Sequence, residues 1–149
     1  MTRSLSRSAV VPAPPAQVFD LLADPRRHPE IDGSGTVRGV VSGPDRLRLG
    51  SRFGMRMRLG LPYVIRNEVV ELVPDERIAW RHFGHHVWRY ELEPLGTGTR
   101  VTETFDWSTS LSPRGLELLG IPARNARSIE ATLDRLVGRF SATAGSSAP

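Results

Sequence analysis

The sequence has no cysteine among its 149 residues, and it has no long apolar run. Without cysteine there is no disulfide framework, no zinc finger and no thiol nucleophile. The longest apolar runs, such as residues 61–65, have about five members, whereas a helix that crosses a bilayer needs about 20. Near the N-terminus the apolar segment Ala9–Val11 stops at Pro12, too early for a signal peptide. We therefore expect a cytoplasmic protein without a membrane span.

Lysine is absent as well, so all 20 basic residues are arginine, and the formal net charge is +4. Because a guanidinium group hardly titrates, the sequence pI of about 10.8 overstates the positive charge at pH 7. Six arginines and no acid lie in residues 46–66, whereas eight acids and four arginines lie in residues 67–106. We expect these segments to neutralise each other across a solvated sheet face. With no helix-turn-helix, aromatic RNA motif or basic tail, we do not expect a nucleic-acid partner.

Familiar catalytic motifs are also missing. The chain has no glycine-rich phosphate loop, no Gly-x-Ser-x-Gly nucleophile elbow and no His-Glu-x-x-His zinc helix. His82, His85 and His86 lie close together, but adjacent side chains of an extended loop point apart. We therefore expect neither a metal ion nor another cofactor.

Glycine and proline divide the chain into segments whose apolar spacing indicates secondary structure. Residues 3–11 are typical of a strand. Residues 13–22 predict a short helix, because prolines are tolerated in a first helical turn and three apolar residues fall on one face. Residues 25–32 form either a second short helix or an exposed loop, and we expect the Gly-Ser-Gly at 33–35 to act as a flexible joint.

Residues 36–109 indicate six strands of about eight residues each, separated by turn formers, which is typical of a meandering antiparallel sheet. After a short helical turn at 116–119, apolar residues at spacings of three and four predict a long amphipathic helix over 124–142. We expect the small, polar residues 144–149 to be disordered. The chain is then a single domain, 1–149, ordered over about 3–142.

This order of elements predicts an α+β fold. A curved antiparallel sheet of seven strands, with two short helices after the first strand, needs a cover for its apolar face. Only the C-terminal helix is long enough to supply that cover.

The register of the hairpins decides which side chains share the covered face. A turn at residues 96–97 places Tyr90 opposite Glu103 and Trp88 opposite Phe105. The result is a mostly apolar face on the last two strands.

The preceding hairpin extends this face by one strand. A three-residue loop at 84–86 places His82 opposite Trp88 and Trp80 opposite Tyr90. The neighbouring charged residues then point to water.

Between residues 52 and 59, apolar residues alternate with arginines, which assigns Phe53, Met55 and Met57 to the inner face. Strand 63–73 is ambiguous. With a turn at 60–62, the inner set is Tyr63, Ile65, Asn67 and Val69; with a turn one residue different, it is Val64, Arg66, Glu68 and Val70. We favour the first set because it keeps two charges out of the interior, and a β-bulge would make both partly correct.

Glu103 is a carboxylate on this apolar face, and its removal from water without a partner costs several kcal/mol. It either pairs with a buried group such as Tyr90 or borders a wet cavity that binds a ligand. His82 is either a hydrogen-bonded histidine of the core or rim, or a general base.

The order of elements and three local phrases resemble the START/polyketide cyclase and lipid-transport superfamily, often called SRPBCC. The phrases are APPAQVFDLLAD (13–24), VVELVPDERIAW (69–80) and GTRVTETF (98–105). The resemblance covers about residues 3–142 and implies a helix-grip fold, in which a curved sheet wraps the long C-terminal helix and leaves a hydrophobic cavity. Members of this superfamily bind lipids, hormones or polyketides; some cyclise or dehydrate a polyketide, and others carry ligands or bind proteins.

We interpret the protein as a binder of a small hydrophobic, lipid- or polyketide-like molecule held between the sheet and the C-terminal helix. One alternative is a polyketide cyclase or dehydratase, with Glu103 or His82 as general base and Tyr90 as hydrogen-bond donor. Another is a protein-interaction module that uses the arginine-rich strands, and a homodimer is left open. The predicted ligand-binding residues are Phe53, Met55, Met57, Asn67, Trp80, His82, Trp88, Tyr90, Glu103, Phe105, Trp107, Ile129 and Leu133.

Overall fold

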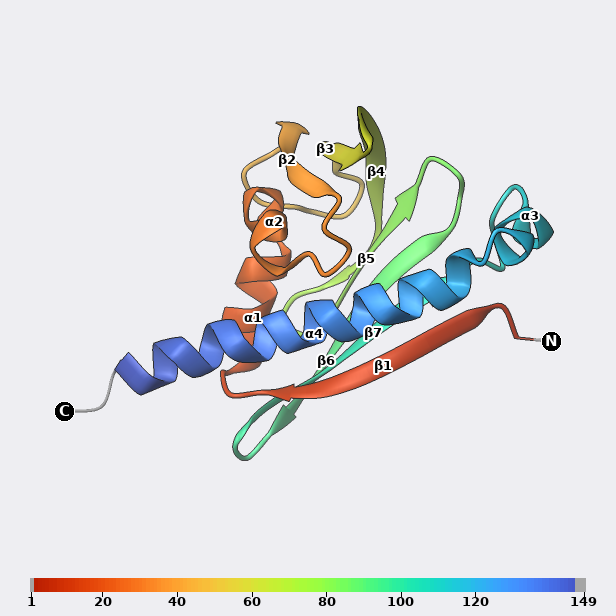
Figure 1. Cartoon of the computed structure of the whole chain (residues 1–149). Coiled ribbons are helices and arrows are strands. Elements are labelled where there is room, and N and C mark those ends of the chain that lie inside the picture. The colour runs from red at the N-terminus through yellow and green to blue at the C-terminus, as the bar shows by residue number, and fades with distance from the viewer. Residues whose placement is uncertain (1, 147–149) are drawn as a thin grey trace.

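The computed structural model describes residues 2–146, whose strands form one curved antiparallel sheet (Figure 1). The order across the sheet is β1-β7-β6-β5-β4-β3-β2, so strands two to seven form the predicted meander and the first strand lies beside the last. The strands are β1 (Ser4–Val11), β2 (Val37–Ser42), β3 (Arg52–Leu59), β4 (Leu61–Val73), β5 (Arg77–His82), β6 (Val87–Leu95) and β7 (Gly98–Asp106).

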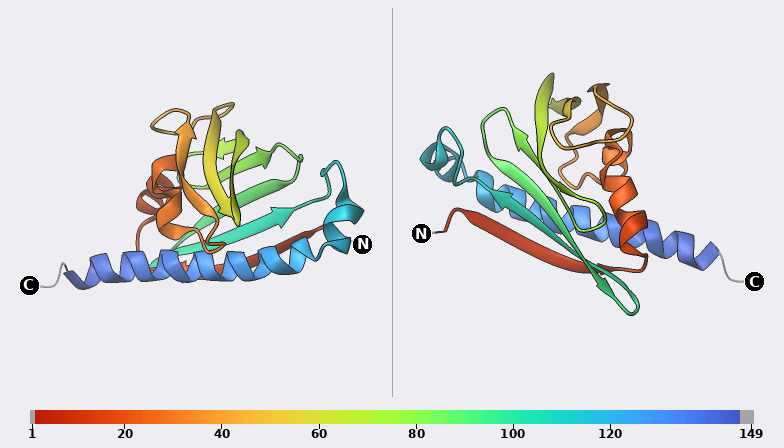
Figure 2. Two further views of the ribbon diagram at one scale, coloured as in Figure 1. Left: turned by 45° about the horizontal axis from the view of Figure 1, so that its top comes forward. Right: turned by 180° about the vertical axis from the view of Figure 1, so that it is seen from behind.

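Within residues 2–146 four α-helices and one 3-10 turn accompany the sheet. They are α1 (Pro15–Leu22), the 3-10 turn Pro25–Arg27, α2 (His28–Ile31), α3 (Pro113–Leu118) and α4 (Ile121–Ser146). The helix α4 runs alongside β1 and across the open side of the curved sheet (Figures 1 and 2). The predicted α+β helix-grip architecture, with seven strands and a long C-terminal helix, is confirmed.

The two short helices after β1 both contribute to the core. Pro15 stands in the first turn of α1, and the apolar side of this helix is buried. In α2 the side chains of His28 and Ile31 are buried too. Of the two alternatives for residues 25–32, the short helix is therefore correct, and it is not exposed.

The inner face of β4 follows the first of the two predicted sets. Asn67 is paired with Phe53, and Ile65 with Met55, so these side chains share the face that the apolar residues of β3 occupy. A β-bulge at Val70 then shifts the register between β4 and β5. The first inner set is therefore confirmed, and because the bulge follows Val69 it does not bring Val64 or Arg66 to the inner face.

Two of the predicted hairpins differ in register from the structure. Trp80 is paired with Trp88 rather than with Tyr90, and the β3–β4 turn has Gly60 alone where three residues were expected. Each difference amounts to two residues, so every side chain stays on its predicted face. The predicted β6–β7 register, with Tyr90 opposite Glu103, is confirmed.

The helix α4 is longer than the sequence indicated. It begins at Ile121 instead of 124 and continues to Ser146, so residues 144–146 are helical rather than disordered. Residues 147–149, for which disorder was also expected, lie outside the described residues. Within the described part of the chain, no helix is both long and apolar enough to cross a membrane.

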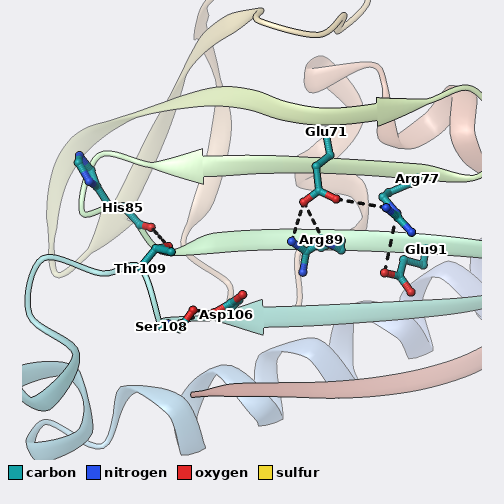
Figure 3. A network of polar contacts seen from close by, with 8 residues as sticks. All are labelled: Glu71, Arg77, His85, Arg89, Glu91, Asp106, Ser108 and Thr109. Carbon is teal, nitrogen blue, oxygen red and sulfur yellow. Dashed lines mark hydrogen bonds and ion pairs between the residues drawn. The ribbon is translucent and has the colours of Figure 1, made fainter. Parts of the chain in front are cut away.

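Ion pairs on the outer face of the sheet join β4, β5 and β6 (Figure 3). The Glu71 carboxylate accepts a hydrogen bond of 2.6 Å from Arg89 and lies 3.5 Å from Arg77. Arg81 binds Glu68 at 3.1 Å. These acids and arginines all belong to the segment 67–106.

The arginine-rich segment 46–66 takes little part in these pairs. Arg46 binds Asp20 at 2.9 Å. In residues 2–146 no acidic side chain lies within ion-pair distance of the other five arginines, which are Arg48, Arg52, Arg56, Arg58 and Arg66. The two segments face each other where Arg52 is the cross-strand partner of Glu68, but Glu68 forms its ion pair with Arg81 of the later segment.

Candidate ligand-binding site

A cavity of about 380 Å³ lies between the curved sheet, α4 and the segment that contains α2. Strands β2 to β7 supply its wall on the sheet side, and Leu22 at the end of α1 reaches it as well. At this place the side chains of α4 do not fill the space above the apolar face of the sheet.

The helix α4 presents a half-polar stripe to the cavity. Residues at spacings of three and four fall on one face of a helix. The stripe consists of Ile121, Arg124, Asn125, Ser128, Ile129 and Thr132. The wall opposite the sheet therefore offers hydroxyl, amide and guanidinium groups among aliphatic ones.

The segment after α2 is fastened to α4 and closes another side of the cavity. The Asp32 carboxylate accepts hydrogen bonds from Ser34 N (3.0 Å), Ser34 Oγ (2.7 Å) and Val37 N (3.0 Å). Gly33 N donates to Thr132 Oγ1 at 2.9 Å. A Cβ atom on Gly33 would overlap backbone atoms of α4, so the expected flexible joint is a packed contact instead.

Aromatic rings form the floor of the cavity. The His28 ring stacks on Trp80 with ring centroids 5.0 Å apart, and Phe53 meets Trp80 edge-on at 5.7 Å. His28 Nε2 donates to the Leu22 carbonyl oxygen at 2.8 Å, and burial lowers the pKa of this histidine. The ring is therefore neutral at pH 7 and behaves as part of an aromatic wall.

Tyr90 and Glu103 form a buried pair on β6 and β7. Tyr90 Oη donates to Glu103 Oε1 at 2.8 Å, and the second carboxyl oxygen, Oε2, is buried without a hydrogen-bond partner among the described residues. Burial raises the pKa of Glu103 to about 8, against the lowering effect of the Tyr90 hydrogen bond. At pH 7 the carboxyl group is mostly protonated, so Oε2 can donate a hydrogen bond into the cavity.

A second polar group lines the cavity on β4 and β5, where Asn67 and His82 are cross-strand partners. Asn67 Oδ1 and His82 Nδ1 are buried, and neither has a hydrogen-bond partner among the described residues. The His82 ring stacks on His86 with centroids 4.5 Å apart, and burial lowers the pKa of each histidine to about 4. These groups are uncharged at pH 7, and the Asn67 oxygen can accept a hydrogen bond from a ligand.

Most of the predicted ligand-binding residues meet around this one cavity. Those that line it are Phe53, Met55, Met57, Asn67, Trp80, His82, Trp88, Tyr90, Glu103 and Ile129. Phe105, Trp107 and Leu133 are buried but do not belong to the lining. Phe105 packs between Trp88 and Trp107, with centroid distances of 4.9 and 5.4 Å, so it supports the wall from behind.

Most of the lining residues that the predicted list lacks lie on helices and loops, and four lie on strands, namely Val37, Leu59, Tyr63 and Ile65. Asn125 and Ser128 fall on the apolar stripe of α4, so helical spacing alone could have identified them. His28, Asp32 and Thr36 carry no such signal, because the position of their segment depends on a tertiary contact with α4.

A curved antiparallel sheet that grips a long helix and leaves a cavity between them defines the class of helix-grip proteins. The chain belongs to the family "Polyketide cyclase / dehydrase and lipid transport", whose model matches residues 2–141. The resemblance seen in the sequence is thereby confirmed.

Similar proteins agree with this assignment. The uncharacterized protein Rv0088 of Mycobacterium tuberculosis is 48% identical over 142 residues, which cover 91% of this chain and 63% of that protein. The chain thus spans less than two thirds of the length of this relative.

Solved structures share the fold at low sequence identity. Protein Ms6760 from Mycobacterium smegmatis superposes with a TM-score of 0.72 at 19% identity, over 95% of this chain and 93% of that one. The di-domain ARO/CYC StfQ from the steffimycin biosynthetic pathway superposes with a TM-score of 0.72 at 15% identity, over 96% of this chain and 52% of that one.

Proposed function

We propose that the protein binds a small, mostly apolar molecule with at least one hydrogen-bonding oxygen in the cavity between the sheet and α4. One observation carries this proposal: Asn67 Oδ1, His82 Nδ1 and Glu103 Oε2 are buried without a hydrogen-bond partner in residues 2–146, and all three residues line this cavity. Leaving a buried polar atom unpaired costs about 1–3 kcal/mol, and a ligand that pairs with it removes that cost.

The chemistry of the ligand follows from the walls. Aromatic and aliphatic side chains surround the polar atoms, and a volume of about 380 Å³ suits a few fused rings or a short acyl chain. The family description, with its polyketide cyclases, dehydrases and lipid transport, supports a lipid- or polyketide-like molecule.

Calorimetric titration with naphthalene and with naphthol tests this proposal. Both are flat, apolar molecules, but naphthol adds one hydroxyl group that can donate to Asn67 or accept from Glu103. We expect naphthol to bind about three- to tenfold more tightly than naphthalene, because one neutral hydrogen bond increases the affinity by about this factor. Absence of binding by both compounds, together with a clean native mass spectrum of freshly purified protein, would contradict a ligand-binding cavity of this kind.

A pair of tryptophans provides a matched control. Trp88 and Trp107 both pack on Phe105, but only Trp88 lines the cavity. We expect Trp88→Ala to weaken naphthol binding by about tenfold, because an aromatic contact is worth about 1 kcal/mol or more. Trp107→Ala should leave the affinity unchanged, and equal losses in the two variants would indicate a general loss of structure.

A cyclase or dehydratase activity is a second candidate, favoured by the Tyr90–Glu103 pair. A carboxyl group with a pKa of about 8 can give its proton to a departing hydroxyl group, which leaves as water, and then take a proton from the neighbouring carbon. Glu103→Gln should then abolish dehydration of a β-hydroxyketone model substrate and keep its binding. Equal turnover by Glu103→Gln and the wild type would remove Glu103 from this role.

A further inference from the structure

Exposed apolar side chains gather on three elements that border the cavity. These elements are the β3–β4 turn, the β5–β6 turn and α3 with its flanking residues. Leu61 on the first is 78% exposed and Leu118 on the third is 88% exposed. We call this set the apolar rim, and it comprises Leu59, Leu61, Phe83, Leu111, Leu118 and Leu119.

The three elements lie along one side of the molecule. In Figure 1 they follow one another from the top to the right of the view, and the rear view of Figure 2 shows the same succession. Backbone and side-chain hydrogen bonds tie two of them together: Leu111 N donates to the Gly84 carbonyl at 3.1 Å, and Thr109 Oγ1 donates to the His85 carbonyl at 2.7 Å (Figure 3).

The cavity lining includes residues from this same side. Leu59 and Tyr63 come from the β3–β4 hairpin, His86 from the end of the β5–β6 turn, and Ile121 from the start of α4 directly after α3. The apolar rim therefore surrounds one end of the cavity. An apolar molecule that left the cavity at this end would meet exposed leucines first.

Three exposed arginines without an ion-pair partner among the described residues lie beside the apolar rim. Arg56, Arg58 and Arg66 are exposed on the outer side of β3 and β4, and no acid among the described residues lies within ion-pair distance of them. Of the acids on the adjoining elements, Glu68 binds Arg81, Glu117 accepts hydrogen bonds from Arg3 and Trp107, and Asp106 accepts hydrogen bonds from Ser108. A partner of negative charge would fit this side.

We propose that the apolar rim and these arginines dock on the surface of a membrane that contains anionic phospholipids. Leucines on separate projecting elements suit the deformable boundary between headgroups and acyl chains, whereas a protein partner would need a continuous groove or face. Unpaired arginines beside them bind lipid phosphates. The inference goes beyond the proposed function, because docking of the rim does not require a ligand in the cavity.

Vesicle sedimentation tests the proposal with the intact protein. We expect the wild type to sediment with vesicles of equal parts phosphatidylglycerol and phosphatidylcholine, to bind pure phosphatidylcholine vesicles at least about tenfold more weakly, and to be released by added salt. Absence of binding to the anionic vesicles, or equal binding to both kinds, overturns the proposal.

The chain offers a matched pair of double variants. Arg58→Gln/Leu61→Ser changes one exposed arginine and one exposed leucine of the proposed surface, and Arg48→Gln/Leu49→Ser makes the same changes in the exposed β2–β3 loop. We expect the first variant to bind anionic vesicles at least about tenfold more weakly and the second to bind like the wild type. Equal binding by the two variants overturns the proposed surface.

Naphthol titration of the same variants separates this inference from the proposed function. Neither Arg58 nor Leu61 lines the cavity, so naphthol affinity should remain at the wild-type value while vesicle binding falls. Unchanged circular dichroism establishes that both variants are folded. Naphthol binding without vesicle binding in the wild type would overturn the docking surface and leave the cavity proposal standing.

Discussion

At the scale of single residues, Glu103 shows how burial changes the chemistry of a common side chain. One oxygen of its carboxyl group accepts a hydrogen bond from Tyr90, and the second oxygen is buried with no hydrogen-bond partner in the described part of the chain. The sequence left open whether Glu103 pairs with Tyr90 or borders a cavity, and the structure has it do both. The burial of the Glu103 carboxyl group is caused by residues that are distant in the chain, so no local sequence pattern predicts it.

The first prediction concerns the pH dependence of stability in Glu103→Gln. Between about pH 4.5 and about pH 8, Glu103 is protonated in the folded protein and ionised in the unfolded chain. Rising pH therefore lowers the free energy of unfolding of the wild type, by at most about 1.4 kcal/mol per pH unit. The contribution of Glu103 to stability is lost completely once the pH passes the pKa of the folded state. Glutamine does not ionise, so the variant lacks this slope.

Urea unfolding of both proteins across this pH range measures the effect. We expect the unfolding free energy of the wild type minus that of Glu103→Gln to fall steadily up to about pH 8 and to level off above it. A difference that stays constant with pH would show that Glu103 keeps its ordinary pKa in the folded state.

At the scale of elements, side-chain facing could be predicted more reliably than register. The β5–β6 hairpin is two residues out of the expected register, and yet Trp80 and Trp88 lie on the predicted face. The reason is that strand facing has a period of two, so the face depends only on whether a shift is odd or even. The exact turn geometry depends on backbone conformation, such as the positive φ of Gly60, which composition does not specify.

The second prediction concerns the contact between the α2 segment and α4. Gly33→Ala places a Cβ atom against the Ser128 carbonyl oxygen and the Thr132 amide nitrogen. Because helix backbone does not yield easily, we expect a loss of about 1–3 kcal/mol in unfolding free energy, together with weaker naphthol binding. Gly39→Ala is the control, since nothing lies within 4 Å of a Cβ at that position. Equal stability of the two variants would contradict the close contact.

At the scale of the whole molecule, buried neutral groups set the pH at which the fold is most stable. His28, His82 and His86 have pKa values lowered by burial, to about 4 for the last two. As the pH falls below about 6.5, these histidines become protonated in the unfolded chain while they are still neutral in the folded protein. The free energy of unfolding therefore decreases as the pH falls. Glu103 acts in the opposite direction, since its contribution is lost as pH rises to about 8.

The third prediction follows from these opposed effects. We expect the free energy of unfolding to be greatest near about pH 6.5 and to decrease toward both pH 4.5 and pH 8.5, by on the order of 1 kcal/mol or more on each side. Chemical denaturation at these three pH values measures the profile. A stability that rises continuously from pH 6.5 to pH 8.5 would contradict the buried, protonated state of Glu103.

The sequence by itself determined the order of elements, the α+β helix-grip class and most of the sheet side of the cavity. Alternation in strands and the stripe of α4 are local periodicities, and burial of an apolar face follows from them directly. Only the tertiary structure decided where the α2 segment lies against α4. It also decided that, among the described residues, the buried polar atoms of Asn67, His82 and Glu103 have no hydrogen-bond partner and Arg56, Arg58 and Arg66 have no acid within ion-pair distance. These features depend on which distant side chains meet, and such distances arise only when the sheet curves around the helix.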